Sequence, residues 1–228
     1  MIAIPTALPV ALIALALFSP ALHAETFTEP FNDPLEEGWS WAGSKKENRS
    51  LGARKLKIKI GTGNYFGAEN DMENLLLRDP LTRGDENGQE VHEVEVTLRA
   101  RGGGTHAGLV LQRGVSDGVA VIAMQAGRES FVALMVEEGD KTRMVERHKC
   151  STLNLRIRLT RKGNSVRPAY YDVLKRQWKN MKAVEMKGAA NSQIGLISGK
   201  GAEKGSDTAI FTAFSSKRTS TGAATIGL

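Results

Sequence analysis

The sequence predicts an all-β protein, a two-sheet antiparallel sandwich of jelly-roll type with about a dozen strands. Two observations lead to this fold class. Most segments between Gly, Pro, Asn and Asp residues alternate between apolar and polar side chains, and few stretches show the 3.6-residue stripe of a helix. The connections between these segments are short and carry glycines, which the tight turns of antiparallel strands require.

The alternation is clearest in residues 55–60 and 91–98, where every second side chain is apolar. One set of side chains in each segment is therefore expected to face the core and the other to face water. The expected core residues are Leu56, Ile58, Ile60, Val94, Val96 and Leu98. Further strands are expected around 39–41 and over 74–78, 107–112, 118–125, 130–137, 142–147, 153–160, 166–173, 178–184, 194–197 and 208–214.

Residues 1–24 are expected to be a signal peptide and not part of the fold. They contain no Asp, Glu, Lys or Arg, and an apolar run over 10–18 precedes Ala24, a small residue suited to cleavage. The run is shorter than the ~20 residues that span a bilayer, which disfavours the alternative of an uncleaved anchor. The expected organisation is a leader, one β-sandwich domain over 25–214, and a flexible tail over 215–228. The expected location is outside the cell, or in the periplasm or cell envelope.

The composition excludes several classes of site. The chain of 228 residues is 41% hydrophobic and 25% charged, so it can build a core without a disulfide or a metal. Its single cysteine, Cys150, excludes a disulfide framework and a cysteine-based zinc site. Burial is the favoured interpretation of this thiol, and a nucleophile activated by His148 is the alternative. We expect a monomer without a cofactor.

The formal net charge of +6 raises the question of a nucleic-acid partner. The basic residues are spread over strand faces, and no recognition motif accompanies them, so nucleic acid is not expected. A basic surface on an exported protein favours a polysaccharide or glycan, with an anionic one as a candidate.

A family resemblance is carried by segments 31–41, 55–58, 74–78, 107–111, 155–164, 170–178, 194–198 and 209–214. Together they resemble the concanavalin A-like lectin/glucanase superfamily. Within it the chain is most similar to the domains appended to family 43 β-xylosidases and to related exported proteins of unknown function. The resemblance implies a sandwich that binds carbohydrate. Two departures are an Asn48-Arg49 pair where a further aromatic is common, and a hairpin over 172–178 that lacks glycine.

Glucanase relatives carry carboxylates at alternate positions of one strand, where neighbouring side chains project together at about 6.6 Å. The best match is Glu93-Val-Glu95, although the third position is Thr97. Catalysis by these two glutamates is the alternative to a solvated pair neutralised by Arg99 and Arg101.

Sugar binding requires aromatic faces with planar polar side chains nearby. Tyr65 and Trp178 are the expected exposed platforms, while Trp39 or Trp41 is expected to fill the interior. Tyr170 and Tyr171 share the predicted hairpin with Trp178. The expected ligand-binding residues are Tyr65, Arg78, Glu93, Glu95, Arg113 and Trp178. For Arg78 and Arg113, the alternative is an ordinary cross-strand ion pair.

Two polar loops offer further candidates. Glu69, Asp71 and Glu73 provide oxygen donors of the kind that calcium prefers, with a solvated turn as the alternative. An Arg-Gly-Asp triplet over 83–85 would suggest adhesion, or is a chance match in a charged loop. The favoured function is therefore non-catalytic carbohydrate binding. The alternatives are a hydrolase using Glu93 and Glu95, and a structural envelope or adhesion domain without a small ligand.

Overall fold

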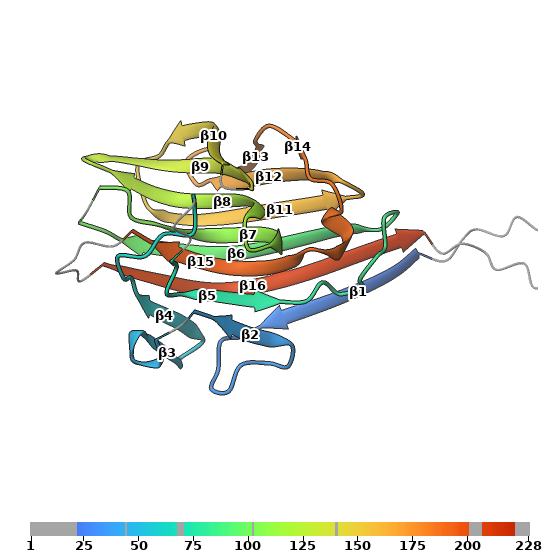
Figure 1. The fold of residues 1–228 in the computed structure, drawn as a ribbon, viewed down its shortest axis with the longest axis horizontal. Coiled ribbons are helices and arrows are strands. Elements are labelled where there is room, and N and C mark those ends of the chain that lie inside the picture. The colour runs from blue at the N-terminus through green and yellow to red at the C-terminus, as the bar shows by residue number, and fades with distance from the viewer. Residues whose placement is uncertain are drawn as a thin grey trace, which may run out of the picture.

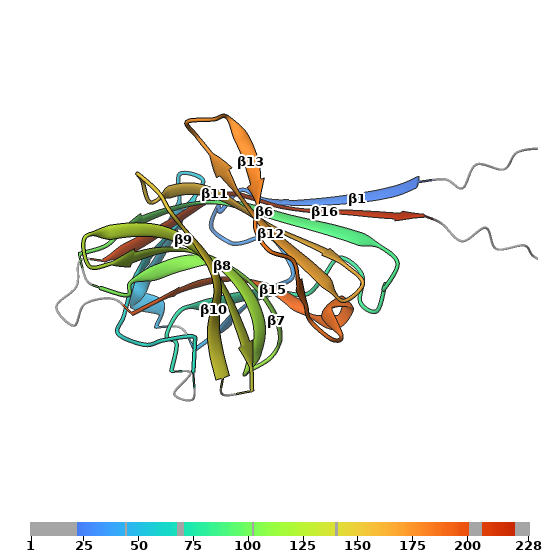
Figure 2. The ribbon, with the colours of Figure 1, turned by 90° about the horizontal axis from the view of Figure 1, so that it is seen from above.

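The computed structural model describes residues 22–43, 45–67, 71–101, 103–139, 141–200 and 207–221. Within these residues sixteen strands form two antiparallel sheets that pack face to face, and strand accounts for 62% of the structure. Figure 1 shows one sheet in front of the other, and Figure 2 shows the two layers from above. The predicted all-β sandwich is confirmed.

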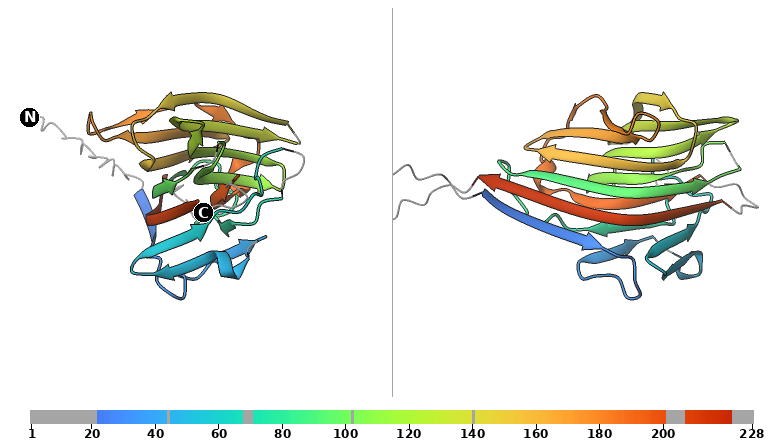
Figure 3. Two further views of the ribbon diagram at one scale, coloured as in Figure 1. Left: turned by 90° about the vertical axis from the view of Figure 1, so that its left-hand side faces the viewer. Right: turned by 180° about the vertical axis from the view of Figure 1, so that it is seen from behind.

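The larger sheet, sheet A, has the strand order β13-β12-β11-β6-β16-β4-β3, with β1 beside β16 and β14 beside β12. In the view from behind in Figure 3, β16 (red) lies between β1 (blue) and β6 (green). The strands of sheet A are β1 (Leu22–Glu29), β3 (Arg49–Gly52), β4 (Lys55–Lys59), β6 (Gln89–Arg99), β11 (Asn154–Lys162), β12 (Ser165–Asp172), β13 (Gln177–Asn180), β14 (Val184–Glu185) and β16 (Thr208–Thr221).

The smaller sheet, sheet B, has the order β10-β9-β8-β7-β15-β5-β2. Its strands are β2 (Trp39–Ala42), β5 (Leu75–Arg78), β7 (His106–Gly114), β8 (Asp117–Ala126), β9 (Glu129–Glu138), β10 (Lys141–Lys149) and β15 (Gln193–Gly199). Two single-turn 3-10 helices, η1 (Lys46–Asn48) and η2 (Ala189–Asn191), lie in connections.

The main core fills the space between the two sheets and has the composition that the alternation predicts. The six expected core residues lie in β4, in β6 and at Ile60, directly after β4. The side chain of each is at most 4% exposed. Burial of each such aliphatic side chain contributes roughly 1.5–3 kcal/mol relative to exposure. Because side chains alternate along a strand, fixing these residues inward places Glu93, Glu95 and Thr97 on the outer face of sheet A.

Strand ends differ from the expectation in three places. The segment over 178–184 divides into β13 and β14. The backbone N–H of Met181 donates to Pro168 O at 2.9 Å, but Pro168 has no N–H to return the bond, and the regular pairing of β13 with β12 ends there. β1 begins at Leu22, within the expected leader, the rest of which lies outside the described residues. β16 continues to Thr221, so residues 215–221 are strand and not tail, since β1 pairs with all of them and β6 pairs with 215–219. Residues 222–228 lie outside the described residues.

A second apolar cluster lies on the outer face of sheet B, under the loop that joins β4 to β5. Tyr65, Phe66 and Met72 of this loop pack over outward-facing side chains of the sheet, among them Val110 and Ile122. Tyr65 is only 1% exposed, and its ring meets that of Phe66 at 5.1 Å in a T-shaped arrangement. The expectation that Tyr65 is an exposed platform is therefore wrong, because the loop that carries it covers a sheet instead of a ligand.

The phenol of Tyr65 requires a glycine beneath it. A Cβ atom on Gly118 would lie 2.7 Å from Tyr65 Oη and 3.3 Å from Leu111 O. We expect Gly118→Ala to destabilise the protein by roughly 1–3 kcal/mol, the usual cost of overpacking. Gly114→Ala is the matched control, because no atom lies within 4 Å of a Cβ built there.

Urea denaturation of both variants and of Gly118→Ala/Tyr65→Phe measures this cost. The double variant should recover part of the loss, since it removes the hydroxyl that the new methyl group meets. Equal midpoints for Gly118→Ala and Gly114→Ala would show that the loop does not pack as described.

Candidate functional site

The outer face of sheet A brings together two aromatic side chains, two arginines and two glutamates from four strands. Tyr171 of β12 is paired directly with Trp178 of β13. On the next pair of strands, Arg156 and Arg158 of β11 lie opposite Glu95 and Glu93 of β6. We call this set the aromatic–arginine face, and it consists of Glu93, Glu95, Arg156, Arg158, Tyr171 and Trp178.

The indole of Trp178 lies across the neighbouring strand toward β11. The guanidinium carbon of Arg158 is 3.8 Å from the centre of the indole, and that of Arg156 is 5.5 Å from the centres of both aromatic rings. Ala169, the cross-strand neighbour of Arg158, lies between them and is small enough to let the indole pass. Tyr171 meets Trp178 edge-on at 5.7 Å. The half-buried indole is thus held from two sides while part of it remains in contact with solvent.

Both glutamates of the face are bound to arginines. Arg158 donates from Nε to Glu93 at 2.7 Å and from its terminal nitrogen at 2.5 Å, and Arg156 approaches the same carboxylate at 3.4 Å. Glu95 lies 3.6 Å from Arg156 Nε and accepts a hydrogen bond from the Thr212 hydroxyl at 3.3 Å. The two carboxylates therefore do not face one another across a vacant cleft. They form a planar polar surface beside the aromatic pair.

A hollow adjoins Glu95 where β16 changes its partner. Residues 208–211 of β16 pair with β4, and residues 214–221 pair with β1. The register with β6 shifts at this point, and Ala213 takes a left-handed conformation with φ 53°. The hollow is lined by Thr28, Glu29, Pro30, Glu36, Arg54, Glu95, Thr212, Ala213, Phe214 and Ser215. Polar groups of several strands are thus accessible next to the aromatic–arginine face.

Of the six ligand-binding residues expected from the sequence, the structure brings three together and separates the other three. Glu93, Glu95 and Trp178 share the outer face of sheet A, whereas Tyr65, Arg78 and Arg113 belong to sheet B and its covering loop. The Arg78 guanidinium lies 3.5 Å from the centre of the Phe27 ring and donates to Glu37 O. Arg113 donates to Asp117 at 2.5 Å and to Lys187 O at 2.7 Å.

The other tryptophans lie at the edge of the core, each partly buried. Trp39 packs against Phe214 with ring centres 4.9 Å apart, and the Arg49 guanidinium covers Trp41 at 3.9 Å. Neither ring is fully buried, so no tryptophan takes the interior position expected for one of them; the fully buried aromatic side chains of the main core are Phe31, Phe211 and Phe214.

The expected calcium ligands do not converge in the described part of the chain. Asp71 accepts the backbone N–H of Asn64 at 2.8 Å, and Glu73 pairs with Lys45 at 2.6 Å. Glu69 lies outside the described residues. Among the residues that the structure describes, no group of three or more His, Cys, Asp or Glu side chains is arranged to hold a metal ion.

The environment of Cys150 favours a thiol over a thiolate. The side chain is half-buried, and burial raises its pKa. His148 donates from Nε2 to the Glu146 carboxylate at 2.5 Å, and its ring lies tilted against that of Tyr170 with ring centres 5.5 Å apart. The imidazole is thus engaged by a carboxylate, and a cysteine nucleophile finds no support here.

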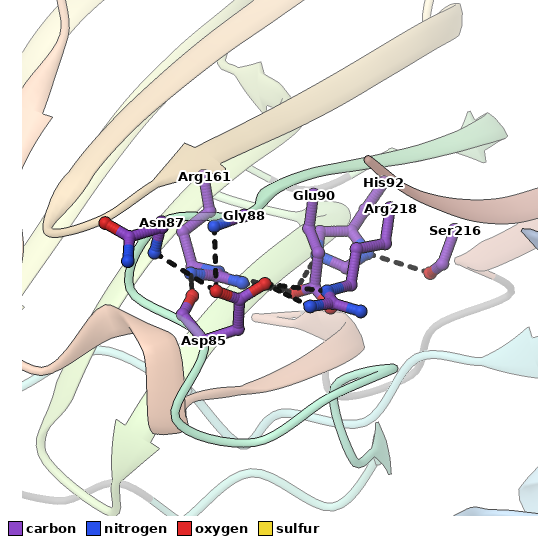
Figure 4. A network of polar contacts seen from close by, with 8 residues as sticks. All are labelled: Asp85, Asn87, Gly88, Glu90, His92, Arg161, Ser216 and Arg218. Atoms are coloured by element: carbon purple, nitrogen blue, oxygen red, sulfur yellow. Dashed lines mark hydrogen bonds and ion pairs between the residues drawn. The ribbon is translucent and has the colours of Figure 1, made fainter. Parts of the chain in front are cut away.

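A buried polar cluster that the sequence did not predict lies at one end of the sandwich (Figure 4). It forms from inward-facing residues of three neighbouring strands, because Glu90 of β6 lies opposite Arg161 of β11 and Arg218 of β16. Arg161, 1% exposed, is 3.1 Å from Glu90 and donates to Asp85 O at 2.9 Å. At the next inward-facing position of β6, His92 Nδ1 and the Ser216 hydroxyl of β16 form a hydrogen bond of 2.8 Å.

The cluster also explains the Arg-Gly-Asp triplet. Arg218 holds the Asp85 carboxylate, with Nε at 3.0 Å, and the backbone N–H of Gly88 donates to it at 2.9 Å. These contacts lower the pKa of Asp85, chiefly through the bond from Arg218. The aspartate therefore closes the end of the sandwich and is not presented to a partner.

Comparison with known proteins supports the fold. No family model matches the chain, and no curated protein matches it. Among solved structures, the GH43 protein BlXynB from Bacillus licheniformis has a TM-score of 0.70 at 13% identity, over 86% of this chain and 39% of that one. Xylan beta-1,4-xylosidase from Bacillus halodurans C-125 has a TM-score of 0.67 at 13% identity, over 83% and 38%.

The CBM2 module of the evolved Dit of Lactobacillus casei BL23 phage J-1 is similar over its whole length, with a TM-score of 0.61 at 10% identity over 89% of this chain and 99% of that one. This chain spans about two fifths of the two GH43 proteins. The expected resemblance to family 43 proteins is confirmed as a likeness of β-sandwich folds, while membership of the concanavalin A-like superfamily stays a prediction. In the described residues, no helix has the length and apolarity that crossing a membrane would need.

The buried Arg161–Glu90 pair gives a stability prediction. We expect Arg161→Met to cost roughly 3–5 kcal/mol, because it leaves the Glu90 carboxylate buried without its cation. Arg143→Met is the matched control, since Arg143 forms an exposed pair with Glu138 at 3.9 Å, worth less than about 1 kcal/mol. Urea midpoints measure both, and Arg161→Met/Glu90→Gln should regain part of the loss. Similar midpoints for the two single variants would contradict the buried pair.

Two buried histidines predict a loss of stability in mild acid. Burial lowers the pKa of His92 to about 3 and that of His106 to about 4. Below pH ~6.5, the ordinary pKa of histidine, these two side chains bind protons in the unfolded chain but not in the folded one. The free energy of unfolding therefore falls as the pH falls toward 4. Each histidine contributes at most about 1.4 kcal/mol per pH unit.

Urea midpoints between pH 7 and pH 4 test this dependence. His92→Gln and His106→Gln should each show a shallower fall than the parent protein, because each removes one group that titrates differently in the two states. Parallel curves for all three proteins would mean that other groups cause the acid sensitivity.

Proposed function

We propose that this chain is an exported carbohydrate-binding module of the β-sandwich type, and that it binds its glycan without cleaving it. The proposed binding surface is the aromatic–arginine face with the adjoining hollow beside Glu95. The observation that carries the proposal is the pairing of Tyr171 and Trp178 next to arginine–glutamate rows on one solvent-facing sheet.

The chemistry of this surface suits a sugar. Pyranose rings present C–H groups that pack on an indole, and their hydroxyls exchange hydrogen bonds with planar polar groups. Trp178 supplies the apolar surface, and Arg156, Arg158 and the two glutamates supply donors and acceptors at its side. The ion pairs hold these side chains in place before a ligand arrives, which lowers the entropy that binding must overcome.

The same ion pairs speak against the hydrolase alternative. A glycosidase needs one carboxyl group that donates a proton and a second that acts as nucleophile or base, with the scissile bond between them. Here the Glu93 carboxylate accepts contacts from two arginines, and the Glu95 carboxylate contacts one arginine and accepts a hydrogen bond from a hydroxyl. Both groups are thus committed to acceptor roles. The GH43 proteins of similar fold are more than twice as long as this chain, so the likeness does not carry an active site with it.

The proposal includes export of the protein, and the intact mass of the mature chain tests it. A secreted or periplasmic protein whose intact mass corresponds to a chain starting at Glu25 would agree with removal of residues 1–24. An intact mass that includes the leader would overturn this part of the proposal and leave the binding surface untouched.

Glycan binding is tested with variants of one hairpin. On a glycan array followed by calorimetry, we expect Trp178→Ala to weaken binding about tenfold or more, because it removes the packing surface for the sugar ring. Leu174→Ala is the matched control, as Leu174 is 86% exposed at the tip of the same hairpin and outside the aromatic–arginine face. Retained binding in Trp178→Ala would exclude this face.

A reducing-sugar assay on every glycan bound decides between binding and catalysis. The proposal expects no release by the parent protein. Release of reducing sugar by the parent protein that is lost in the Glu93→Gln variant would instead establish the hydrolase.

A further inference from the structure

A basic hollow lies on the outer face of sheet A, over β4, the start of β16 and the end of β6, away from the aromatic residues of β12 and β13. It is lined by Lys57, Lys59, Arg99, Ala100, Arg101 and Thr208. Its volume of about 560 Å³ is in the range of sites for small ligands. Four of its six lining residues carry a positive charge and none carries a negative one.

Strand register places the cations on both sides of β16. Thr208 of β16 pairs with Lys59 of β4 on one side and with Arg99 of β6 on the other. Lys57 follows two residues from Lys59, about 6.7 Å along the strand, and β4 is about 9.6 Å from β6 across β16. All four cationic side chains are exposed. They therefore surround a common area of surface at separations of several ångströms.

These charges are not neutralised by carboxylates of the described chain. Among the residues that the structure describes, none of the four cations takes part in an ion pair. The nearby Asp207 is fully buried and accepts the backbone N–H of Arg101 and the Thr105 hydroxyl, each at 2.9 Å. It fixes the backbone of Arg101 and does not enter the hollow.

The contrast with the rest of the same face is informative. Arg156 and Arg158 are matched by Glu93 and Glu95, whereas the cations of the basic hollow have no such partners in the described structure. An array of like charges held close together on a folded surface is unfavourable unless counter-charge comes from solution. A ligand that carries several anionic groups would supply that counter-charge.

We propose that the basic hollow binds the carboxylate groups of an acidic polysaccharide whose neighbouring sugars lie on the aromatic–arginine face. The proposal rests on the proposed function and adds the class of glycan. The basic hollow and the aromatic–arginine face are connected along β6, which supports this proposal. Arg99 of the hollow is followed on the outer side of the strand by Thr97, Glu95 and Glu93, at about 6.7 Å per step. Arginine offers a carboxylate two parallel hydrogen bonds, and lysine offers a point charge. A uronic-acid polymer combines such carboxylates with sugar rings.

The experiment compares binding of polygalacturonate oligomers with binding of the same oligomers after their carboxyl groups have been reduced to alcohols. We expect Lys57→Gln/Lys59→Gln to weaken binding of the acidic oligomer about tenfold at low salt, and Arg99→Gln to weaken it further. Binding of the reduced oligomer should not change. The difference between parent and variant should shrink as salt rises, because exposed charges are screened.

Lys141→Gln/Lys187→Gln is the matched control, since it removes the same charge from exposed sites elsewhere and should change binding less than about twofold. Circular dichroism confirms that all variants are folded. An equal loss in the control, or equally tight binding of a DNA duplex through the same four residues, would overturn the hollow as a glycan site.

The outcomes separate this proposal from the proposed function. If the acidic and reduced oligomers bind equally well and Trp178→Ala abolishes both, the carbohydrate function stands and the basic hollow is not part of it. If neither oligomer binds and the glycan array is also negative, both proposals fail.

Discussion

The alternation of side chains along β6 is the constraint on which the rest of the molecule depends. One side of this strand supplies Val94, Val96 and Leu98 to the core and Glu90 to the buried cluster. The other side supplies Glu93, Glu95, Thr97 and Arg99 to the solvent-facing sheet. A shift of one residue in register would bury charged side chains and expose the aliphatic ones, so the core packing also fixes what the outer face presents. The core and the candidate binding surface are thus formed by opposite faces of the same sheet.

Charge is distributed differently over three parts of sheet A. Inside the sandwich, Arg161 and Arg218 are matched by Glu90 and Asp85, as burial requires. On the aromatic–arginine face, arginines and glutamates also match, but in contact with water, where they remain available to a ligand. At the basic hollow the cations stand without carboxylate partners in the described chain. The first arrangement stabilises the fold, the second orders a surface, and the third is the proposed site for an anionic ligand.

The comparisons show how far a shared fold carries a functional argument. Proteins of the GH43 class and a phage module share this sandwich at 13% identity or less. At that distance the common feature is the packing of two sheets, while ligand recognition depends on the few side chains on an outer face. On this chain the loop after β4 covers the outer side of sheet B with its own aromatic cluster. The binding surface that we propose is therefore on the outer side of sheet A.

The sequence by itself determined most of the strands and the direction of their side chains, because both follow from a period of two residues that is readable locally. β1 and β3 were not among the expected strands. It also placed Glu93, Glu95 and Trp178 on strands near the surface. Only the tertiary structure decided which of these residues meet. Arg158 and Glu93 are 65 residues apart in the chain, and Arg218 and Asp85 are 133 apart, so their contacts depend on strand order and register. For the same reason Tyr65 could not be assigned to a buried loop, nor residues 215–221 to a strand: burial and pairing are properties of the partners, and those partners come from distant parts of the chain.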